Sequence, residues 1–126
     1  MEKILIIDDD EAVLSVLKDT LLREGYDVAE ARDGVEGLKL FLEKPADLVM
    51  TDIYMPEKEG LELIQDLRAA SSSVRIIAMS GGSPAVPGFP ALTVADQLGA
   101  DYTIEKPFTR KGMLKLVCVA LREVSE

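Results

Sequence analysis

The sequence predicts an α/β protein with an open, doubly wound parallel sheet of five strands and helices on both faces. Short runs rich in aliphatic residues alternate with longer segments whose apolar residues recur at helical spacing. Glycine, proline or small polar residues separate these segments, and the 126 residues accommodate five strand–helix units. Parallel neighbours require crossover connections, and right-handed crossovers place the connecting helices against the sheet. The predicted arrangement is therefore (βα)5.

Five short segments are predicted to form the strands. The first is an aliphatic run with a polar residue only at its start, which is typical of a parallel strand covered on both faces. The others are runs of five or six residues that lie between turn-forming or charged residues. The predicted strands are Lys3–Ile7, Tyr26–Ala31, Asp47–Thr51, Val74–Met79 and Asp101–Glu105.

Helices are predicted after each strand, where apolar residues recur every three or four positions. The first helix ends at Gly25 and the second is stopped by Pro45. The predicted helices are 11–24, 34–44, 61–70, 91–98 and 109–124. The side chains predicted to point inward from the first two are Val13, Val16, Leu17 and Leu21, then Val35, Leu38, Phe41 and Leu42.

Composition narrows the class of protein. No apolar run is long enough to span a membrane, and the Met-Glu-Lys start leads straight into a strand without the features of a signal peptide. We therefore expect a soluble cytoplasmic protein in which residues 1–126 form one domain. The formal charge of −9 argues against direct binding of nucleic acid.

The cysteine and histidine content excludes two kinds of site. One cysteine and no histidine exclude the usual zinc constellations and any disulfide within the chain. Cys118 lies in the apolar pattern of the last helix, together with Leu114, Val117 and Leu121. A buried and unreactive thiol is expected there.

Polar side chains with reactive chemistry follow four of the five predicted strands. In parallel sheets of this kind, sites lie at the C-terminal strand ends, where the strand order reverses. Asp8 and Asp9 should therefore lie beside Asp52 on the adjacent strand. Two carboxylates ~5 Å apart repel by roughly 3 kcal/mol at an effective dielectric of about 20. The strand-end residues are Asp8-Asp9-Asp10, Asp52, Ser80 with Gly81-Gly82, and Glu105-Lys106.

A divalent cation would relieve this repulsion, and an open site with few protein ligands favours Mg²⁺. Ser80 adds a hydroxyl group and Lys106 adds an ammonium group. Phosphoryl transfer needs these groups, because its catalysis depends on positioning and charge neutralisation. The sequence therefore predicts that Asp52 is the reactive centre.

Each of these residues also has a structural interpretation. Asp8, with Glu11 three residues later, fits a variant of the capping box at the start of the first helix. Asp52 is also compatible with the start of a turn, and Ser80 with the start of an ordinary loop. A lone lysine such as Lys106 is usually exposed to solvent.

Four segments, in this order and on these elements, make the chain resemble the receiver domain of two-component response regulators. The matching segments are ILIIDDD, DLVMTDIYMP followed by Gly60, IIAMSGG, and GADYTIEKPF. The resemblance implies a flavodoxin-like sheet and a phosphoacceptor signalling module of a two-component system or phosphorelay. It also implies that the chain is not an enzyme beyond catalysing its own phosphoryl transfer and dephosphorylation.

The resemblance also implies roles for the acidic residues. Asp52 would take a phosphoryl group from a phosphohistidine on a sensor histidine kinase or phosphotransferase, and this would switch partner binding. Mg²⁺ would be held by Asp8 or Asp9, by Asp52 and by the backbone carbonyl of Tyr54.

Further expectations follow from the same resemblance. Ser80 would hydrogen-bond the phosphoryl group, Lys106 would pair with it, and the Lys106–Pro107 bond would be cis. The partners would be the kinase and a downstream protein, with no nucleic acid or membrane. The chain would be a monomer or a weak, phosphorylation-dependent dimer.

The chain departs from the family pattern in several places, among them position 103 and the segment 82–90. The aromatic residue expected three positions before the lysine is replaced by Thr103, and a tyrosine lies one place earlier, at Tyr102. The segment 82–90 is longer and richer in proline than usual. It is interpreted either as a tolerated surface insertion or, because of Phe89, as a partner-docking loop.

The same residues argue against three other functions. A phosphatase with an aspartyl nucleophile would carry a second aspartate where Tyr54 stands. A flavin- or nucleotide-binding domain would have a first loop rich in glycine, serine or threonine, whereas this one is acidic. A pure interaction module would have lost part of the acidic site. A receiver would act alone, pass phosphate along a relay, or belong to a longer protein.

Overall fold

The protein forms the predicted parallel sheet. The computed structural model describes residues 2–53, 60–80 and 99–124. The strand order is β2-β1-β3-β4-β5, and each neighbouring pair is parallel. The strands are β1 (Lys3–Ile7), β2 (Asp27–Ala31), β3 (Leu48–Asp52), β4 (Arg75–Ser80) and β5 (Tyr102–Glu105).

The strand order reverses at β1, which lies between β2 and β3. From β1 the chain passes first to β2 on one side, then returns to β3 and continues outward to β4 and β5. The crevice at such a reversal is where doubly wound sheets bind ligands, outside the C-terminal ends of the strands. The residues that follow β1 and those at the end of β3 therefore flank the expected site.

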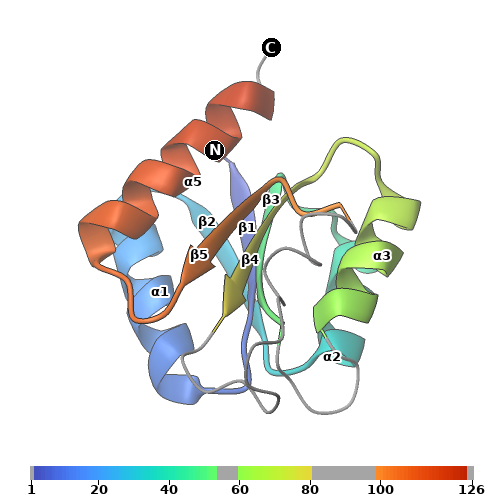
Figure 1. Cartoon of the computed structure of the whole chain (residues 1–126), viewed down its shortest axis with the longest axis horizontal. Coiled ribbons are helices and arrows are strands. Elements are labelled where there is room, and N and C mark those ends of the chain that lie inside the picture. The colour runs from blue at the N-terminus through green and yellow to red at the C-terminus, as the bar shows by residue number, and fades with distance from the viewer. Residues whose placement is uncertain (1, 54–59, 81–98, 125–126) are drawn as a thin grey trace.

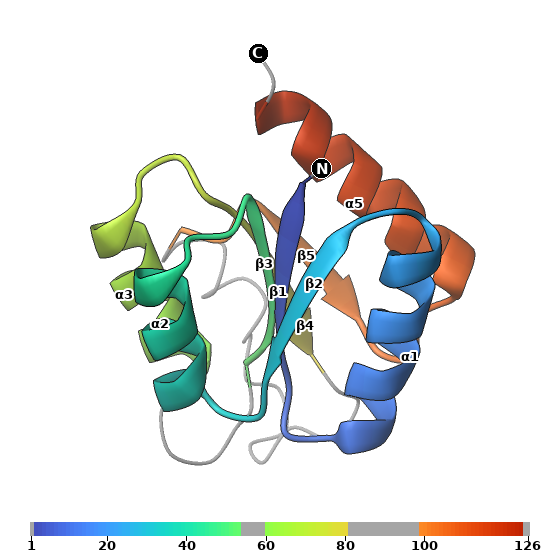
Figure 2. The same cartoon turned by 180° about the vertical axis from the view of Figure 1, so that it is seen from behind.

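The described helices cover both faces of the sheet (Figure 1 and Figure 2). One apolar cluster joins α1 and α5 to the sheet, and a second joins α2 and α3 to its opposite face. The clusters separate because successive side chains of a strand point to opposite faces. The helices are α1 (Glu11–Arg23), α2 (Gly34–Glu43), α3 (Gly60–Ala70) and α5 (Arg110–Val124).

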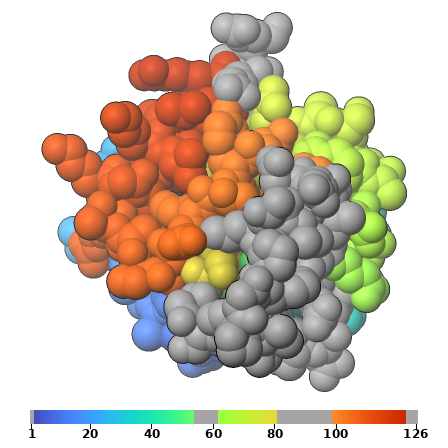
Figure 3. Space-filling view, viewed as in Figure 1, coloured from blue at the N-terminus to red at the C-terminus, as the bar shows by residue number. Residues whose placement is uncertain are grey.

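The central strands are buried, whereas the edge strand β5 is not. Every residue of β3 is buried, while β5 alternates between half-buried and exposed positions. In the space-filling view of Figure 3, the orange residues around β5 lie at the surface beside the red α5. Burial of apolar area therefore holds β5 less firmly than it holds β3.

The predicted inward face of α2 was partly wrong. Phe41 is buried as predicted, but Val35 is 57% and Leu42 60% exposed. The helix turns Gly37 toward the sheet, where a Cβ would lie 2.5 Å from Cδ1 of Ile7. Close approach of the helix to β1 thus depends on a missing side chain, which an apolar pattern does not reveal.

Two further burial predictions were wrong. Val16 is 44% exposed because the buried stripe of α1 runs through Leu14, Leu17 and Leu21, leaving Val16 outside it. Cys118 is exposed, and its Sγ lies 4.0 Å from the hydroxyl oxygen of Tyr26. It lies one position beyond Val117, which is in the core.

Some predictions lie outside the described residues. They are the helix 91–98, the proline-rich segment 82–90 with Phe89, and the contribution of Tyr54. Within the described part of the chain, no helix is long and apolar enough to cross a membrane.

Candidate functional site

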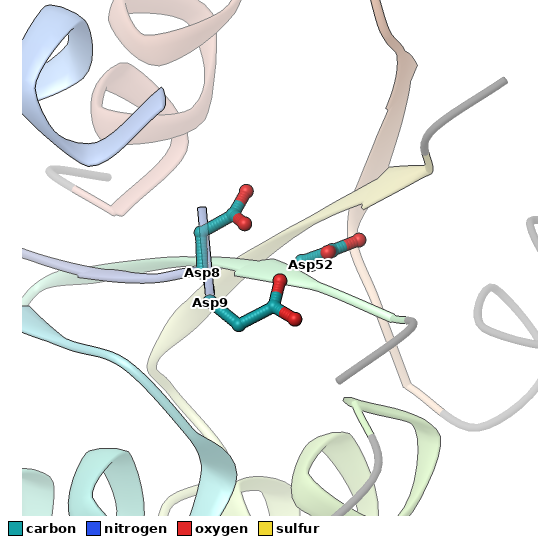
Figure 4. A group of neighbouring side chains, drawn as sticks. All are labelled: Asp8, Asp9 and Asp52. Carbon is teal, nitrogen blue, oxygen red and sulfur yellow. The ribbon is translucent and has the colours of Figure 1, made fainter. Parts of the chain in front are cut away.

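Two neighbouring strands deliver three carboxylates to one place. Asp8 and Asp9 follow β1, and Asp52 ends β3. One oxygen from each carboxylate lies within 4.8 Å of the others, and Figure 4 shows the three side chains side by side. Asp8 and Asp52 are buried, whereas Asp9 is exposed. The sequence-based prediction that these acids meet is confirmed.

The turn between β1 and α1 is held by its own acidic side chains. Asp10 is the N-cap of α1, and its side chain accepts hydrogen bonds from the backbone N–H groups of Ala12 and Val13. Oδ1 of Asp8 accepts the N–H of Asp10 at 2.9 Å. The alternative interpretation of Asp8 as the helix cap is therefore wrong, because Asp10 takes that position and leaves Asp8 and Asp9 for the pocket.

Lys106 follows the edge strand β5 and reaches the acids at the C-terminal ends of the strands. Its Nζ lies 2.5 Å from Oδ2 of Asp8 and 3.6 Å from Oδ2 of Asp52. The side chain is only 17% exposed, so the interpretation of Lys106 as a solvent-exposed lysine is wrong. Its backbone N–H donates to the carbonyl of Ser80 at 2.7 Å, and the Lys106–Pro107 bond is cis, as predicted.

Burial and charge act in opposite directions on Asp8. Loss of hydration raises the pKa of its carboxyl group, and the bonds from Lys106 and the Asp10 N–H only partly oppose this effect. When all three carboxylates are ionised, their charge exceeds that of Lys106 by two units. A hard divalent cation fits such an oxygen-rich pocket in both charge and ligand type.

Ser80, Tyr102 and Thr103 lie on the outer strands β4 and β5. Ser80 ends β4 opposite Glu105 of β5 and is half-buried, so its hydroxyl belongs to the same edge of the sheet. Tyr102 packs against the apolar cluster of α1 and α5, while Thr103 is exposed. Because neighbouring side chains of a strand point to opposite faces, Tyr102 lies on the other face of the sheet from Thr103.

An apolar wall beside the acids was missed by the sequence analysis. It borders an open pocket of about 640 Å³ whose other lining residues are the acids and Lys106. The exposed Val16 is part of it, whereas the apolar pattern of the helix predicts this valine in the core, so the pattern carries no signal for the wall. The wall consists of Ala12, Val13, Val16, Leu17, Pro107 and Phe108.

Comparison with known sequences gives a consistent result. The family "Response regulator receiver domain" matches residues 4–118. The chain is 34% identical to "Transcriptional regulatory protein CpxR" of Klebsiella pneumoniae, covering 97% of this chain and 50% of that protein. It is 35% identical to "Response regulator MprA" of a Mycobacterium species, covering 98% of this chain and 52% of that protein. The chain thus spans about half the length of the curated relatives it matches.

Solved structures agree in fold. A CheY-like response regulator receiver domain protein from Methanospirillum hungatei superposes with a TM-score of 0.91 at 30% identity, covering 99% of this chain and 97% of that one. A receiver domain protein from Clostridium thermocellum gives 0.88 at 26% identity, covering 98% and 96%. On the family match and these relatives, the chain belongs to the receiver domain family of two-component response regulators, the phosphoacceptor modules of those signalling systems.

Proposed function

We propose that Asp52 is the phosphoacceptor and that its donor is a phosphohistidine on a sensor histidine kinase or phosphotransferase. The observation that carries the proposal is the ammonium group of Lys106, held between the buried carboxylates of Asp8 and Asp52. A lysine in this position neutralises charge that arrives at Asp52. Asp52 also ends β3, the neighbour of the strand at which the order reverses, and it lines an open pocket.

The proposed transfer proceeds in line. An oxygen of Asp52 attacks phosphorus, a P–O bond forms, and the P–N bond to the imidazole breaks and leaves its electron pair on nitrogen. Lys106 offsets negative charge on the transferring oxygens, and the Ser80 hydroxyl donates a hydrogen bond to one of them. Water later attacks the phosphorus of the acyl phosphate and releases inorganic phosphate. Asp52 then regains its carboxylate, which resets the signal.

Mg²⁺ is the proposed cofactor, held by Asp8, Asp9 and Asp52 together with the backbone carbonyl of Tyr54. When bound, it would supply positive charge to the phosphoryl oxygens and to the crowded carboxylates. Support comes from the donor set, which is entirely carboxylate oxygen within 4.8 Å, and from the excess negative charge of the pocket.

Mass spectrometry of the intact protein tests whether Asp52 is the phosphoacceptor. With Mg²⁺ and acetyl phosphate as donor, we expect the intact protein to gain the mass of one phosphoryl group. Asp52→Asn should abolish the gain, because the amide is not a competent nucleophile. Asp19→Asn, an aspartate in an exposed ion pair on α1, is the matched control and should retain it. An unmodified wild-type protein, or a gain that persists in Asp52→Asn, would refute the assignment.

We propose that the phosphodonor protein packs against the apolar wall. The exposed Val16 borders the pocket that contains Asp52. Val16→Asp should therefore slow phosphorylation by a phosphorylated histidine kinase but not by acetyl phosphate. Leu22→Asp is the matched control, since Leu22 is a similarly exposed apolar residue of α1 that is not part of the wall. Equal loss of both reactions in Val16→Asp would show that the substitution damages the site itself.

The remaining proposals concern the output. We propose that residues 1–126 form one receiver domain of the cytoplasm, acting through a downstream protein whose binding changes on phosphorylation. We propose no direct contact with nucleic acid, because the charge of −9 opposes it, and no contact with membrane. The proposed state is a monomer or a weak, phosphorylation-dependent dimer, without enzymatic activity beyond its own phosphoryl transfer and hydrolysis.

A further inference from the structure

The start of β5 is tied to β4 by the carboxylate of Asp101. Its Oδ2 accepts the backbone N–H of Ile76 at 2.8 Å, while its own N–H donates to the carbonyl of Ile76 at 2.9 Å. The side chain of Asp101 thus extends the β4–β5 ladder by one more hydrogen bond. Nη1 of Arg75 lies 3.3 Å from the other carboxylate oxygen. Asp101 is therefore fixed directly opposite Ile76.

Arg68 of α3 binds both Asp101 and the backbone before β4 and β5. Its Nη2 donates to Oδ2 of Asp101 at 2.9 Å and to the carbonyl of Gly99 at 2.8 Å. Its Nη1 donates to the carbonyl of Val74 at 2.7 Å and to that of Ser72 at 3.1 Å. One guanidinium group therefore joins the segments that enter β4 and β5. The side chains of Arg68 and Asp101 are only about a quarter exposed, so solvent screens their ion pair less than it screens a surface pair.

The register of β5 decides where Lys106 lies. Asp101 and Lys106 bracket the four paired residues of β5, and the N–H of Lys106 donates to the carbonyl of Ser80. A slip of two residues would keep Tyr102 and Ile104 on the same face, so the apolar pattern alone does not exclude it. Such a slip would move Lys106 by about 6.6 Å. That exceeds its 2.5 Å and 3.6 Å distances to the carboxylates of Asp8 and Asp52.

We infer that Arg68 and Asp101 are positioning residues for phosphoryl transfer. They fix the start of β5, where the strands of the sheet begin. Lys106 at the other end of β5 then reaches Asp8 and Asp52, where the strands end. The inference rests on the proposed role of Lys106 at the phosphoryl group. According to this inference, β5 is positioned by ion pairs and backbone hydrogen bonds. The strands that carry the acids are instead positioned by burial in the core.

The first experiment measures the position of β5 without any phosphorylation. Amide hydrogen exchange is followed in metal-free Asp101→Ala and Arg68→Lys, the second of which keeps the charge and serves if the first does not fold. We expect the Lys106 amide to exchange at least about tenfold faster, as in a local opening, while amides of β1 keep their wild-type rates. Asp19→Ala and Arg23→Lys, which alter an exposed ion pair of the same chemistry, are matched controls and should change neither. Unchanged protection of Lys106 in a folded variant would overturn the inference.

The second experiment separates positioning from general damage. Asp101→Ala should slow phosphorylation by acetyl phosphate about 10- to 100-fold at saturating Mg²⁺, as expected for a misplaced catalytic group. Its Mg²⁺ affinity, measured by calorimetry, should stay within about twofold of the wild type, because the acids lie on other strands. In a Lys106→Ala background the same substitution should have no further effect on the rate.

Two results of the phosphorylation experiment would contradict a positioning role for Asp101. A weaker Mg²⁺ affinity in parallel with the slower reaction, or a full additional loss in Lys106→Ala, would mean that Asp101 supports the fold in general. If wild-type protein is not phosphorylated, the proposed function fails instead. The hydrogen-exchange result for Lys106 then still decides whether Arg68 and Asp101 position β5.

Discussion

The two halves of the candidate site are held in place by different forces. Asp8, Asp9 and Asp52 follow or end strands β1 and β3, whose apolar residues are buried almost completely. Lys106 follows β5, an edge strand with exposed alternate residues that is anchored at its start by Asp101. The acids are thus placed by the core, and the lysine is placed by directional polar contacts.

This difference matters because the two forces respond differently to change. Hydrophobic burial is large and non-directional, so strands inside the core move only if the core is disrupted. A hydrogen bond contributes a modest net free energy, about 1 kcal/mol, but defines position through its geometry. We therefore expect the lysine half of the site to tolerate displacement in a protein that remains folded, and the acidic half to resist it.

The largest expected effect comes from the core beneath the acids. Ile6→Ala removes a fully buried side chain from β1 and should lower the free energy of unfolding by about 2–5 kcal/mol. Ile104→Ala in β5 should cost less than about 2 kcal/mol, since its side chain is only half-buried. Urea unfolding of both variants measures the difference. Equal losses would show that β5 is held by burial as firmly as β1, and the comparison would fail.

The arrangement of the acids was predictable because it follows from strand pattern and topology alone. Aliphatic runs located the strands to within about a residue, and the reversal of strand order placed Asp8 and Asp9 beside Asp52. The direction of the Lys106 side chain needed more than its position after β5. An isolated lysine is usually exposed, and only the excess of carboxylates in the pocket gives it a buried partner.

Other features were missed because they depend on contacts between distant residues. The ion pair between Arg68 and Asp101 joins positions 33 residues apart, and no local sequence pattern reveals it. The face of α2 follows from Gly37, whose missing side chain lets the helix approach Ile7. Periodicity records where apolar residues are, but not where two backbones come close.

Metal binding should give an intermediate effect confined to the acidic half. At ten times its dissociation constant, Mg²⁺ should stabilise the folded protein by about 1.4 kcal/mol and raise Tm by roughly 5 °C. Asp9→Asn should lose most of this gain, whereas Asp101→Ala should keep it, because Asp101 lies at the opposite edge of the sheet. Thermal unfolding with and without Mg²⁺ measures both. A wild-type Tm that does not respond to Mg²⁺ would contradict the proposed metal site.

The same acids should destabilise the metal-free protein. Asp9→Asn and Asp52→Asn each remove one like charge from the cluster, so each variant should melt above the wild type in the presence of a chelator. Asp19→Asn, which breaks an exposed ion pair, is the control and should not. A lower Tm in both pocket variants would mean that these carboxylates serve the structure through bonds of their own.

The smallest expected effect is a pH dependence where the two halves meet, at Asp8 and Lys106. Burial raises the pKa of Asp8 in the folded protein above the ordinary value of 3.8, which applies to the unfolded chain. At a pH between the unfolded and the folded pKa, the folded protein therefore holds a proton that the unfolded chain has released. Stability therefore falls as pH rises through this window. Melting curves of metal-free wild type and Asp8→Asn from acid to neutral pH should show the wild type losing stability relative to the variant.

Displacement of the edge strand β5 should alter the titration of Asp8. If Asp101→Ala displaces Lys106, the ionised form of Asp8 loses a partner, its folded pKa rises further, and the window extends to higher pH. The measurement is the pH-dependent Tm difference between Asp101→Ala and the Asp8→Asn/Asp101→Ala double variant. A window that stays where it is in the wild type would mean that Lys106 keeps its position without Asp101. Core burial would then place both halves of the site.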